Sequence, residues 1–314
     1  MADGINTPLI SVVSPVYLAE KIVDELVSRI DREVSKISGN YEIILVEDGS
    51  PDKSWEKIEE NCLKNKNVVG IKLSRNFGQH YAITAGLAQS RGDYVVLMDC
   101  DLQDPPEEII NLYNKAKDGF DIVLGKRSER KDTFFKKLFG KFFYFLLGYL
   151  TETKIDNTIG AFRIMSRAVV NSFCSMKEYN RFFGGMIGWL GFKTASVNVQ
   201  HAPRASGKTS YNFNKLINLA LNAAVSFSDK PLRLAIKLGF GLTVLSGLYI
   251  FYIVMINIIF GTSAVGWTSL IASVFFSTGL VITLLGVIGL YIGKIFEEVK
   301  RRPLYVIEKI VKKG

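Results

Sequence analysis

The chain has 314 residues and a net charge of +9, and 48% of its residues are hydrophobic. This hydrophobic share is high for a purely soluble protein, so a membrane segment is expected. Three cysteines without a CxxC pair and only two histidines argue against a disulfide framework or a zinc site. Residues 230–314 hold ten Lys or Arg and three Glu, and this clustered positive charge suits anionic lipid head groups better than nucleic acid.

The N-terminus, MADGINTPLISVVSPVY, has no basic stretch followed by a long apolar one. The pattern of a cleavable signal peptide is therefore absent. We expect the domain that follows to stay in the cytosol.

Short apolar runs alternate with helical patterns from residue 9 onward. Predicted strands cover 9–16, 41–46, 68–73, 94–99 and 121–124, and predicted helices cover 22–37, 52–65, 78–90 and 106–117. This alternation predicts an α/β domain with a parallel, doubly wound sheet of Rossmann-like type. Ligands of such sheets bind beyond the carboxyl ends of the strands.

Polar side chains follow three of these predicted strands, at Pro15 to Tyr17, Glu47 to Ser50 and Asp99 to Asp101. We expect the three segments to meet in one acidic cleft, because the carboxyl ends of parallel strands share an edge. Asp99, Asp101 and Asp104 lie close together in the chain, and clustered like charges destabilise one another. A cation or a cationic ligand is therefore expected there.

Two hypotheses apply to Asp99-Cys100-Asp101: a site for a hard divalent cation, or a solvated turn at a strand end. At a strand end, Asp99 and Asp101 would point to one side and Cys100 into the packing. Other phosphate-binding patterns are absent. There is no GxGxxG, and Gly207-Lys208-Thr209 lacks the first glycine of a P-loop because position 202 is Ala202.

Sequence motifs along nearly the whole chain match a known pattern. They are SVVSPVYLAE (11–20), EIILVEDGSPD (42–52), LSRNFGQHYAITAGLAQSRGDYVVLMDCDLQDPPEEI (73–109), DIVLGKR (121–127), FRIMSR (162–167), NRFFGGMIGWLGF (180–192), RASGKTSY (204–211) and RRPLYVI (301–307). Together they resemble glycosyltransferase family 2 enzymes with a GT-A fold. More narrowly, they resemble polyprenyl-phosphate glycosyltransferases, such as bacterial undecaprenyl-phosphate glucosyltransferases and dolichol-phosphate mannose synthase.

This resemblance implies roles for particular residues. The nucleotide sugar would contact Pro15, Tyr17, Glu20, Asp48, Asp99, Gln103, Arg127, Arg204 and Lys208. Asp99, Asp101 and Gln103 would hold Mg²⁺ or Mn²⁺ against the diphosphate, and Arg204 and Lys208 would lie on a loop that closes over it. Asp101 is also assigned to catalysis, because the cation would stabilise the charge that grows on the departing nucleoside diphosphate.

The acceptor side departs from the family pattern at one position. Several relatives have aspartate, considered as the base, where this chain has Ala161 in Gly160-Ala161-Phe162-Arg163. Either Asp156 takes that role, or no strong base is needed. We favour the second, because a lipid monophosphate has a second pKa of about 6 and is largely an oxyanion at neutral pH. The resemblance places Arg163 and Arg181 near the acceptor phosphate, and solvated or salt-bridged surface arginines are the alternative.

Two segments have the pattern of helices that lie in a membrane interface. Residues 134–143 interleave aromatic residues with lysines, which predicts an interfacial helix around 132–150, although an ordinary core segment is the alternative. Residues 211–229 form a second, juxtamembrane candidate. Such helices would hold the cleft near the lipid phosphates.

Two long uncharged stretches follow, 238–260 and 267–293, each long enough to cross a hydrocarbon core of about 30 Å. Two buried helices of a soluble domain are the alternative. Lysines and arginines flank the pair on both outer sides, and the connecting loop has none, so both termini are expected to be cytoplasmic. The predicted organisation is a GT-A domain at 1–210, a juxtamembrane helix at 211–229, two spans within 230–295 and a basic tail at 296–314.

The resemblance implies a metal-dependent, inverting hexosyltransferase of the bacterial inner membrane. It would move glucose from UDP-glucose to undecaprenyl phosphate on the cytoplasmic face, with UDP-galactose, UDP-N-acetylglucosamine or GDP-mannose as alternative donors. A processive polysaccharide synthase is disfavoured, because a QxxRW sequence is absent. A non-catalytic scaffold or lipid-flipping partner is favoured only by Ala161. The oligomeric state stays open between a monomer and a homo-oligomer.

Overall fold

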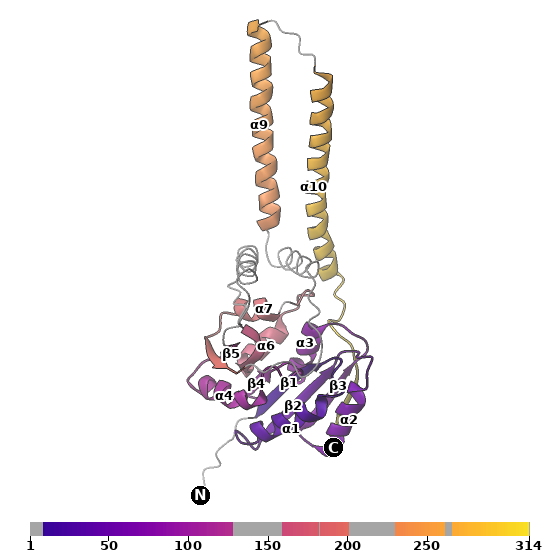
Figure 1. Ribbon diagram of the computed structural model, residues 1–314, viewed down its shortest axis with the longest axis vertical. Coiled ribbons are helices and arrows are strands. Elements are labelled where there is room, and N and C mark those ends of the chain that lie inside the picture. The colour runs from indigo at the N-terminus through magenta and orange to yellow at the C-terminus, as the bar shows by residue number, and fades with distance from the viewer. Residues whose placement is uncertain (1–8, 128–158, 182, 201–229, 261–265, 314) are drawn as a thin grey trace. The chain divides into compact units, whose positions relative to one another are not determined.

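The protein is described from a computed structural model, which covers residues 9–127, 159–181, 183–200, 230–260 and 266–313 (Figure 1). These residues divide into two compact units. The sheet unit contains the described residues up to 200 together with 302–313, and the helical unit contains 230–260 and 266–301. Each unit is described by itself.

The sheet unit is built on eight strands in the order β7-β5-β6-β4-β1-β2-β3-β8. The strands are β1 (Ile10–Val16), β2 (Tyr41–Glu47), β3 (Val68–Leu73), β4 (Tyr94–Leu97), β5 (Ile122–Arg127), β6 (Ile159–Ser166), β7 (Thr194–Val199) and β8 (Ile307–Lys312). Strands β4, β1, β2 and β3 are parallel neighbours. Strand β6 is antiparallel to both β4 and β5, and β8 is antiparallel to β3. The sheet is therefore mixed at both sides of a parallel centre.

Helices cover both faces of this sheet. They are α1 (Val23–Val34), α2 (Ser54–Lys64), α3 (Gln79–Gln89), the 3₁₀ turn η1 (Pro106–Glu108), α4 (Ile109–Lys117), α6 (Arg167–Ser175) and α7 (Phe183–Trp189). Successive strand residues point to opposite faces. Val12 accordingly belongs to the core cluster under α1, whereas a Cβ added to Gly86 of α3 would lie 2.4 Å from Cγ1 of Val13. Helix α3 thus approaches β1 closely because residue 86 has no side chain.

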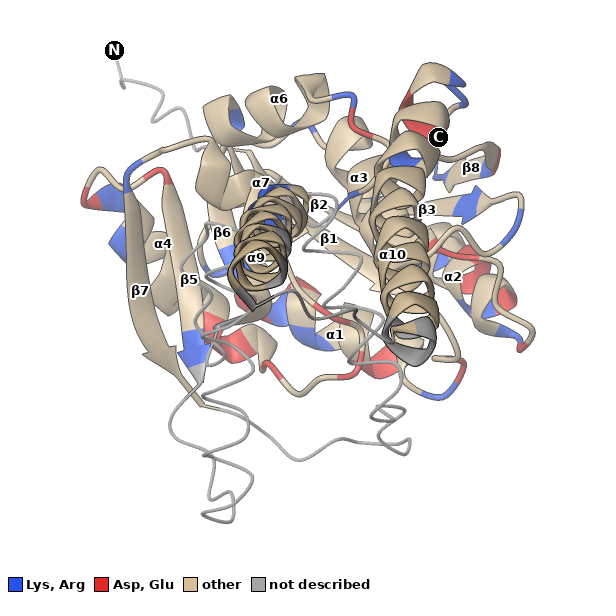
Figure 2. Cartoon of the chain, turned by 90° about the horizontal axis from the view of Figure 1, so that it is seen from above, with Lys and Arg blue, Asp and Glu red and all other residues tan. Residues whose placement is uncertain are grey.

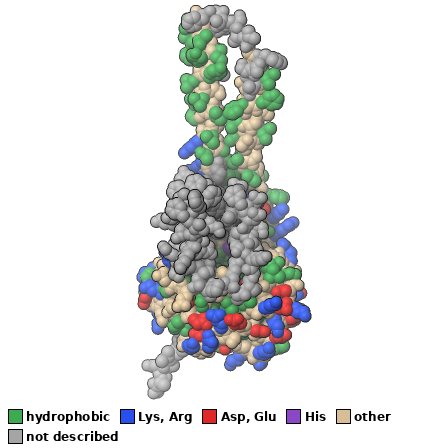
Figure 3. Space-filling view, in the orientation of Figure 1, with side chains coloured by type: hydrophobic (Ala, Val, Ile, Leu, Met, Phe, Trp, Pro, Cys, Tyr) green, Lys and Arg blue, Asp and Glu red, His purple; other side chains and the backbone are tan. Residues whose placement is uncertain are grey.

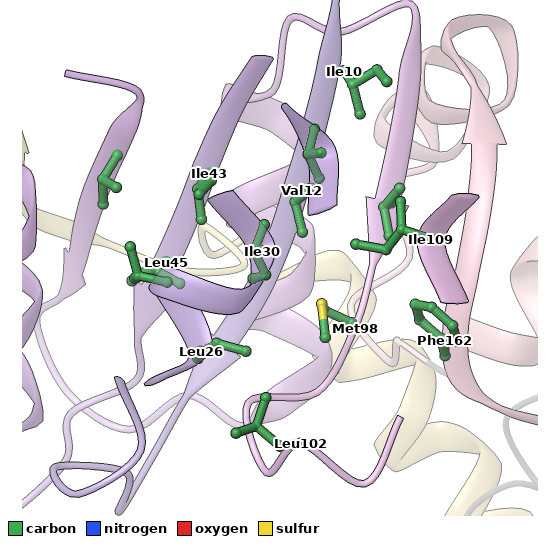
Figure 4. Packing of buried hydrophobic residues seen from close by; sticks show 14 of the residues in the cluster. Ile10, Val12, Leu26, Ile30, Ile43, Leu45, Met98, Leu102, Ile109 and Phe162 are labelled. Carbon is green, nitrogen blue, oxygen red and sulfur yellow. The ribbon is translucent and has the colours of Figure 1, made fainter. Parts of the chain in front are cut away.

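The core on the α1 face follows from the helical spacing of apolar residues. Leu26, Ile30 and Val34 are 0% exposed and recur every four residues, so they form one stripe on α1. Figure 4 shows Leu26 and Ile30 among Ile43 and Leu45 of β2. Burying each of these side chains stabilises the fold by about 1.5–3 kcal/mol. Truncating Ile30 to alanine would cost about 2–5 kcal/mol.

The predicted α/β fold is confirmed, with corrections to the sheet. The first five strands and four helices lie where the sequence predicts them within a few residues, but β4 ends at Leu97, so Asp99 and Asp101 lie in a turn beyond the strand. The sheet is not wholly parallel, because β6 runs antiparallel. The segment expected as a basic tail contains β8, which pairs with β3 as an edge strand.

The helical unit consists of α9 (Lys230–Phe260) and α10 (Trp267–Val299), which contain the two predicted spans. Apolar stretches at 232–256 and 273–299 have mean hydropathies of 2.0 and 2.1 and are 0% buried, which does not fit a buried pair in a soluble domain. Hydrophobic side chains appear along both helices in Figure 3, and Figure 2 shows little charge on them. By length and composition, both helices are able to cross a membrane. The predicted interfacial helices, around 132–150 and 211–229, lie outside the described residues.

Candidate active site

Asp48 follows β2 and holds the loop that leads from β3 into α3. Its side chain is 3% exposed, and its Oδ1 and Oδ2 accept hydrogen bonds from the amides of Phe77 (2.8 Å) and Gly78 (2.9 Å). Burial raises the pKa of the Asp48 carboxyl, while these two amides favour its charged form. The neighbouring Gly49 has a φ of +61°, and a Cβ there would lie 2.3 Å from the amide nitrogen of Asn76. The β2 and β3 ends are thus in close contact.

Glu47, the last residue of β2, is a second buried carboxyl. Only 1% of Glu47 is exposed, and its Oε1 accepts a hydrogen bond from the Ser50 amide. Its Oε2 is buried and has no hydrogen-bond partner among the residues that the structure describes. Burial raises the pKa of Glu47, and the positive charge of Lys72 on β3 partly opposes this shift. Glu47 is a perturbed group that the sequence motifs do not identify, although a carboxyl at the end of a buried strand is a signal for one.

The loop after β1 is tied to the loop after β2. Leu18 and Ala19 donate their amides to the hydroxyls of Ser50 (2.9 Å) and Ser54 (3.0 Å). The predicted Glu20 accepts the Lys53 amide at 3.3 Å through Oε2. Of the other predicted residues here, Pro15 is buried and Tyr17 is 45% exposed, so the Tyr17 ring is available to a ligand at this edge.

Asp99 and Asp101 lie in the turn that follows β4. Asp99 Oδ1 accepts a hydrogen bond from the Gln79 side-chain amide at 2.8 Å, and Asp101 Oδ1 accepts the Gln103 backbone amide at 3.2 Å. Leu102 is 3% exposed and has a φ of 56°, so its buried side chain anchors the turn in a left-handed conformation. The expected packing of Cys100 against the core is confirmed, and burial raises the pKa of its thiol to about 11.

Strand β6 brings a buried arginine to the same edge. Because β6 is antiparallel to β4, its first residues lie beside the carboxyl end of β4, and Arg163 pairs with Leu97, two residues before Asp99. The Arg163 guanidinium donates to the carbonyls of Ala161 (3.0 Å) and Gly160 (2.8 Å). Burial lowers its pKa to about 10, and the charge of Asp99 acts in the opposite direction. The acidic turn and Arg163 are therefore electrostatic neighbours.

Arg181, the other arginine predicted at the acceptor, lies in a different setting. Its guanidinium donates to the carbonyls of Phe173 (3.3 Å) and Met176, at the C-terminal end of α6. Burial lowers the pKa of Arg181, and the nearby Glu178 and, more weakly, Tyr81 in the first turn of α3 oppose this shift. Phe173, which the Arg181 guanidinium contacts, packs against Phe183, which the Arg163 guanidinium contacts. The binding of the acceptor by Arg181 stays a prediction.

The remaining predicted residues are not placed. Asp156, Arg204 and Lys208 lie outside the described residues, and only the backbone of Arg127 is described, at the end of β5. No role is predicted from the sequence for Gln79 or His80. Both follow Gly78 in the RNFGQH motif. The motif supports the family resemblance of this loop, but it does not indicate what the Gln79 and His80 side chains contact. Burial lowers the pKa of His80, and the positive charge of Arg163 lowers it further.

No three His, Cys, Asp or Glu side chains gather as a metal-binding group in the described part of the chain. The oxygen atoms of Asp99 and Asp101 nevertheless suit a hard divalent cation such as Mg²⁺ or Mn²⁺. A cation held by only one or two carboxylates needs further oxygen ligands, which a bound diphosphate supplies. The donor set therefore fits a cation that binds together with a nucleotide.

Comparison with known families matches residues 11–173 to the family described as Glycosyl transferase family 2. The chain is 37% identical over 305 residues to the prophage bactoprenol glucosyl transferase homolog of Escherichia coli, and the match covers 96% of this chain and 99% of that protein. It is 34% identical over 305 residues to the undecaprenyl-phosphate 4-deoxy-4-formamido-L-arabinose transferase of Proteus mirabilis, with coverage of 96% and 94%. These matches extend over both the sheet unit and the long helices.

Solved structures resemble the sheet unit more distantly. Glucosyl-3-phosphoglycerate synthase from Mycobacterium tuberculosis, crystallised with Mn²⁺, uridine diphosphate and phosphoglyceric acid, superposes with a TM-score of 0.51 and 19% identity. The match covers 69% of this chain and 76% of that one. At this identity the likeness shows the shared fold.

Proposed function

Because the chain belongs to glycosyltransferase family 2, we propose that it transfers one hexose, with inversion, from a nucleotide sugar to polyprenyl phosphate. We propose UDP-glucose as the donor and undecaprenyl phosphate as the acceptor. Relatives named bactoprenol glucosyl transferase support this choice. A relative named for transfer of a formamido-arabinose keeps other sugars, including galactose, N-acetylglucosamine and mannose, as alternatives.

The observation that carries this proposal is the meeting of four strand ends at one edge of the sheet. Asp48 after β2 holds the loop after β3, and that loop contacts Asp99 after β4 through Gln79. Strand β6 adds Arg163, which pairs with Leu97 at the end of β4. Carboxylates next to a cation are the groups needed to bind a metal–diphosphate and a phosphate acceptor side by side.

In the proposed reaction, an oxygen of the lipid phosphate attacks C1 of the sugar from the face opposite the nucleotide. A bond between that oxygen and C1 forms while the bond from C1 to the diphosphate oxygen breaks. The acceptor oxygen is already ionised at neutral pH, because the second pKa of a phosphate monoester is about 6. Ala161 in place of an acidic residue is compatible with this chemistry, since positive charge near the acceptor matters more than a base.

Asp99 and Asp101, with Gln103 beside them, would hold Mg²⁺ or Mn²⁺, as the fold neighbour crystallised with Mn²⁺ and uridine diphosphate suggests. Such a cation, when bound, neutralises negative charge on the leaving diphosphate. Asp48 and Tyr17 would position the base and ribose, and Arg163 would orient the acceptor phosphate. Arg204 and Lys208 are proposed to close over the diphosphate.

We further propose that α9 and α10 cross the bacterial inner membrane, with the sheet unit and both termini in the cytoplasm. The basic residues on both outer sides of the pair support this orientation. A membrane anchor would also give access to an acceptor with a long hydrocarbon tail.

The experiment is a donor survey with the purified full-length protein in detergent. Undecaprenyl phosphate and Mg²⁺ or Mn²⁺ are combined with UDP-glucose, UDP-galactose, UDP-N-acetylglucosamine or GDP-mannose, and lipid-linked sugar is measured together with nucleotide release. We expect one donor to give lipid product. Asp101→Ala is expected to lower the rate by about 10³-fold or more, because it removes a group that stabilises the leaving charge. Asp118→Ala, the same change at an exposed helix end, serves as the control.

Lipid product from GDP-mannose alone would replace the proposed donor and keep the reaction class. Nucleotide binding without product from any donor would instead favour a non-catalytic role. Transfer that resists chelation and the Asp101→Ala substitution would contradict the proposed metal site.

A further inference from the structure

Gln79 is the first residue of α3 and an exposed side chain at the candidate active site. Gly78 precedes it with a φ of +107°, a conformation that favours glycine, and the Gly78 amide is bound by Asp48. The position of Gln79 is therefore set by the buried Asp48. Gly78, the N-cap residue of α3, has no side chain of its own, and the Asp48 carboxylate accepts its amide.

The side-chain amide of Gln79 donates to Asp99 Oδ1 at 2.8 Å. This hydrogen bond joins residues 20 positions apart in the chain and has a charged acceptor. It completes a path from Asp48, through the backbone of Phe77 and Gly78, to Asp99. The loop that Asp48 holds thus also holds the Asp99 carboxylate.

We infer that Gln79 is a positioning residue that orients the Asp99 carboxylate for a divalent cation. The inference rests on the proposed function, in which Asp99 is a cation ligand, and adds a residue that acts through it. A hydrogen bond from an amide to one oxygen restricts the orientation of a carboxylate before the cation binds. The conformational entropy lost on cation binding is therefore smaller. Groups that hold a metal ligand in this way typically contribute about 10–100-fold to metal affinity.

The linkage also connects two parts of the site. Asp48, predicted to contact the base, and Asp99, predicted to bind the cation, are held by one short segment of residues 77–79. A bound nucleotide that restricts the motion of this segment would therefore also restrict the orientation of the Asp99 carboxylate. Cation binding is expected to be tighter with the nucleoside diphosphate present, partly through Gln79.

The test is direct Mn²⁺ binding to the purified full-length protein, measured by the electron paramagnetic resonance signal of free Mn²⁺, with and without uridine diphosphate. Gln79→Met removes the amide and keeps a similar length and volume. We expect it to weaken Mn²⁺ binding by about 10–100-fold in the presence of the diphosphate. Gln89→Met, the same change at the exposed far end of α3, is the matched control and is expected to bind Mn²⁺ as the wild type does.

Turnover separates positioning from structural damage. Gln79→Met is expected to need more Mn²⁺ for half-maximal transfer while its kcat at saturating Mn²⁺ stays within a few-fold of wild type. Gln79→Asn has a shorter side chain, whose amide does not reach Asp99. It should therefore also need more Mn²⁺ for half-maximal transfer than the wild type. Unchanged Mn²⁺ affinity in both Gln79 variants would overturn the inference and leave the proposed function intact. Wild-type protein that transfers sugar without binding Mn²⁺ or Mg²⁺ would overturn the metal assignment, and the inference with it.

Discussion

Two regions of the sheet unit each contain a buried arginine that is predicted to bind the acceptor phosphate. The charged groups around the two arginines differ. Arg163 in the middle of β6 and Arg181 after α6 are each 6% exposed. Each donates to two backbone carbonyls, and each guanidinium lies about 5 Å from a phenylalanine ring centre, at 4.9 Å for Arg163 and 5.0 Å for Arg181. Residue type, burial and ring contact therefore do not distinguish them.

Their charged neighbours do distinguish them. Arg163 lies within the electrostatic influence of Asp99 and lowers the pKa of His80, so it belongs to the carboxyl edge of the sheet. Arg181 binds the last carbonyls of α6, where a positive charge stabilises a helix end, and its neighbours include Tyr305 near β8 and Tyr81 of α3. A buried arginine thus indicates an anion site only when the groups around it belong to that site.

The largest effect that tests this difference is expected from Arg163→Met. Removing the positive charge beside the acidic turn should lower transfer to the lipid acceptor by about 10²–10³-fold per folded molecule, because a fixed cation stabilises charge at the reacting phosphate. The kinetics with undecaprenyl phosphate as the varied substrate are the measurement.

Arg163→Lys is the matched variant, since it keeps the charge and loses the forked donor. Partial recovery of the rate is expected. A folded Arg163→Met protein with the wild-type rate and acceptor KM would reduce Arg163 to a structural residue and remove the contrast with Arg181.

Arg181→Met should affect stability instead of chemistry. The carbonyls of Phe173 and Met176 would lose a charged donor, and the Phe173 carbonyl would keep the Met176 amide, so the expected cost in unfolding free energy is about 1–3 kcal/mol. Denaturant unfolding of the purified protein measures this loss, and kcat per folded molecule should stay unchanged. An unaltered unfolding midpoint with a raised KM for the lipid phosphate would show that the acceptor prediction for Arg181 is right.

Much of the fold is predictable because local patterns and tertiary structure agree in the first 127 residues. Continuous apolar runs such as 41–46 locate strands directly, and apolar residues repeated every four positions locate helices such as α1. Strands β6, β7 and β8 are harder to predict, because their pairing depends on distant partners. β8 has exposed charged residues and becomes a strand by pairing with β3, more than 230 positions earlier in the chain.

Site residues are predictable from the sequence where several functional side chains lie close together in one segment, as Asp99 and Asp101 do. Contacts between segments are not visible in the sequence. Nothing local shows that Gln79 contacts Asp99, or that Arg181 turns to the end of α6, because each contact depends on how a loop folds. The family resemblance places both arginines at the acceptor, whereas the structure shows that their backbone partners and charged neighbours differ.

The smallest expected effect concerns Glu47. This carboxyl is buried beside Asp48, and it extends the comparison of buried charged groups from Arg163 and Arg181 to an acid. Its folded pKa is raised above 4.5 by burial, so the protonated form is favoured in the folded state. The stability linked to that proton is present below about pH 4.5 and is lost as the pH rises through the folded pKa.

Glu47→Gln, which imitates the protonated form, should therefore gain stability relative to wild type between pH 4.5 and 7, on the order of 1 kcal/mol, the size of one buried hydrogen bond. Thermal unfolding across this range measures the gain, and Glu56→Gln on the exposed side of α2 should show no such trend. If Glu47→Gln is instead less stable at pH 7, attraction between the ionised carboxylate and Lys72 outweighs the burial of its charge.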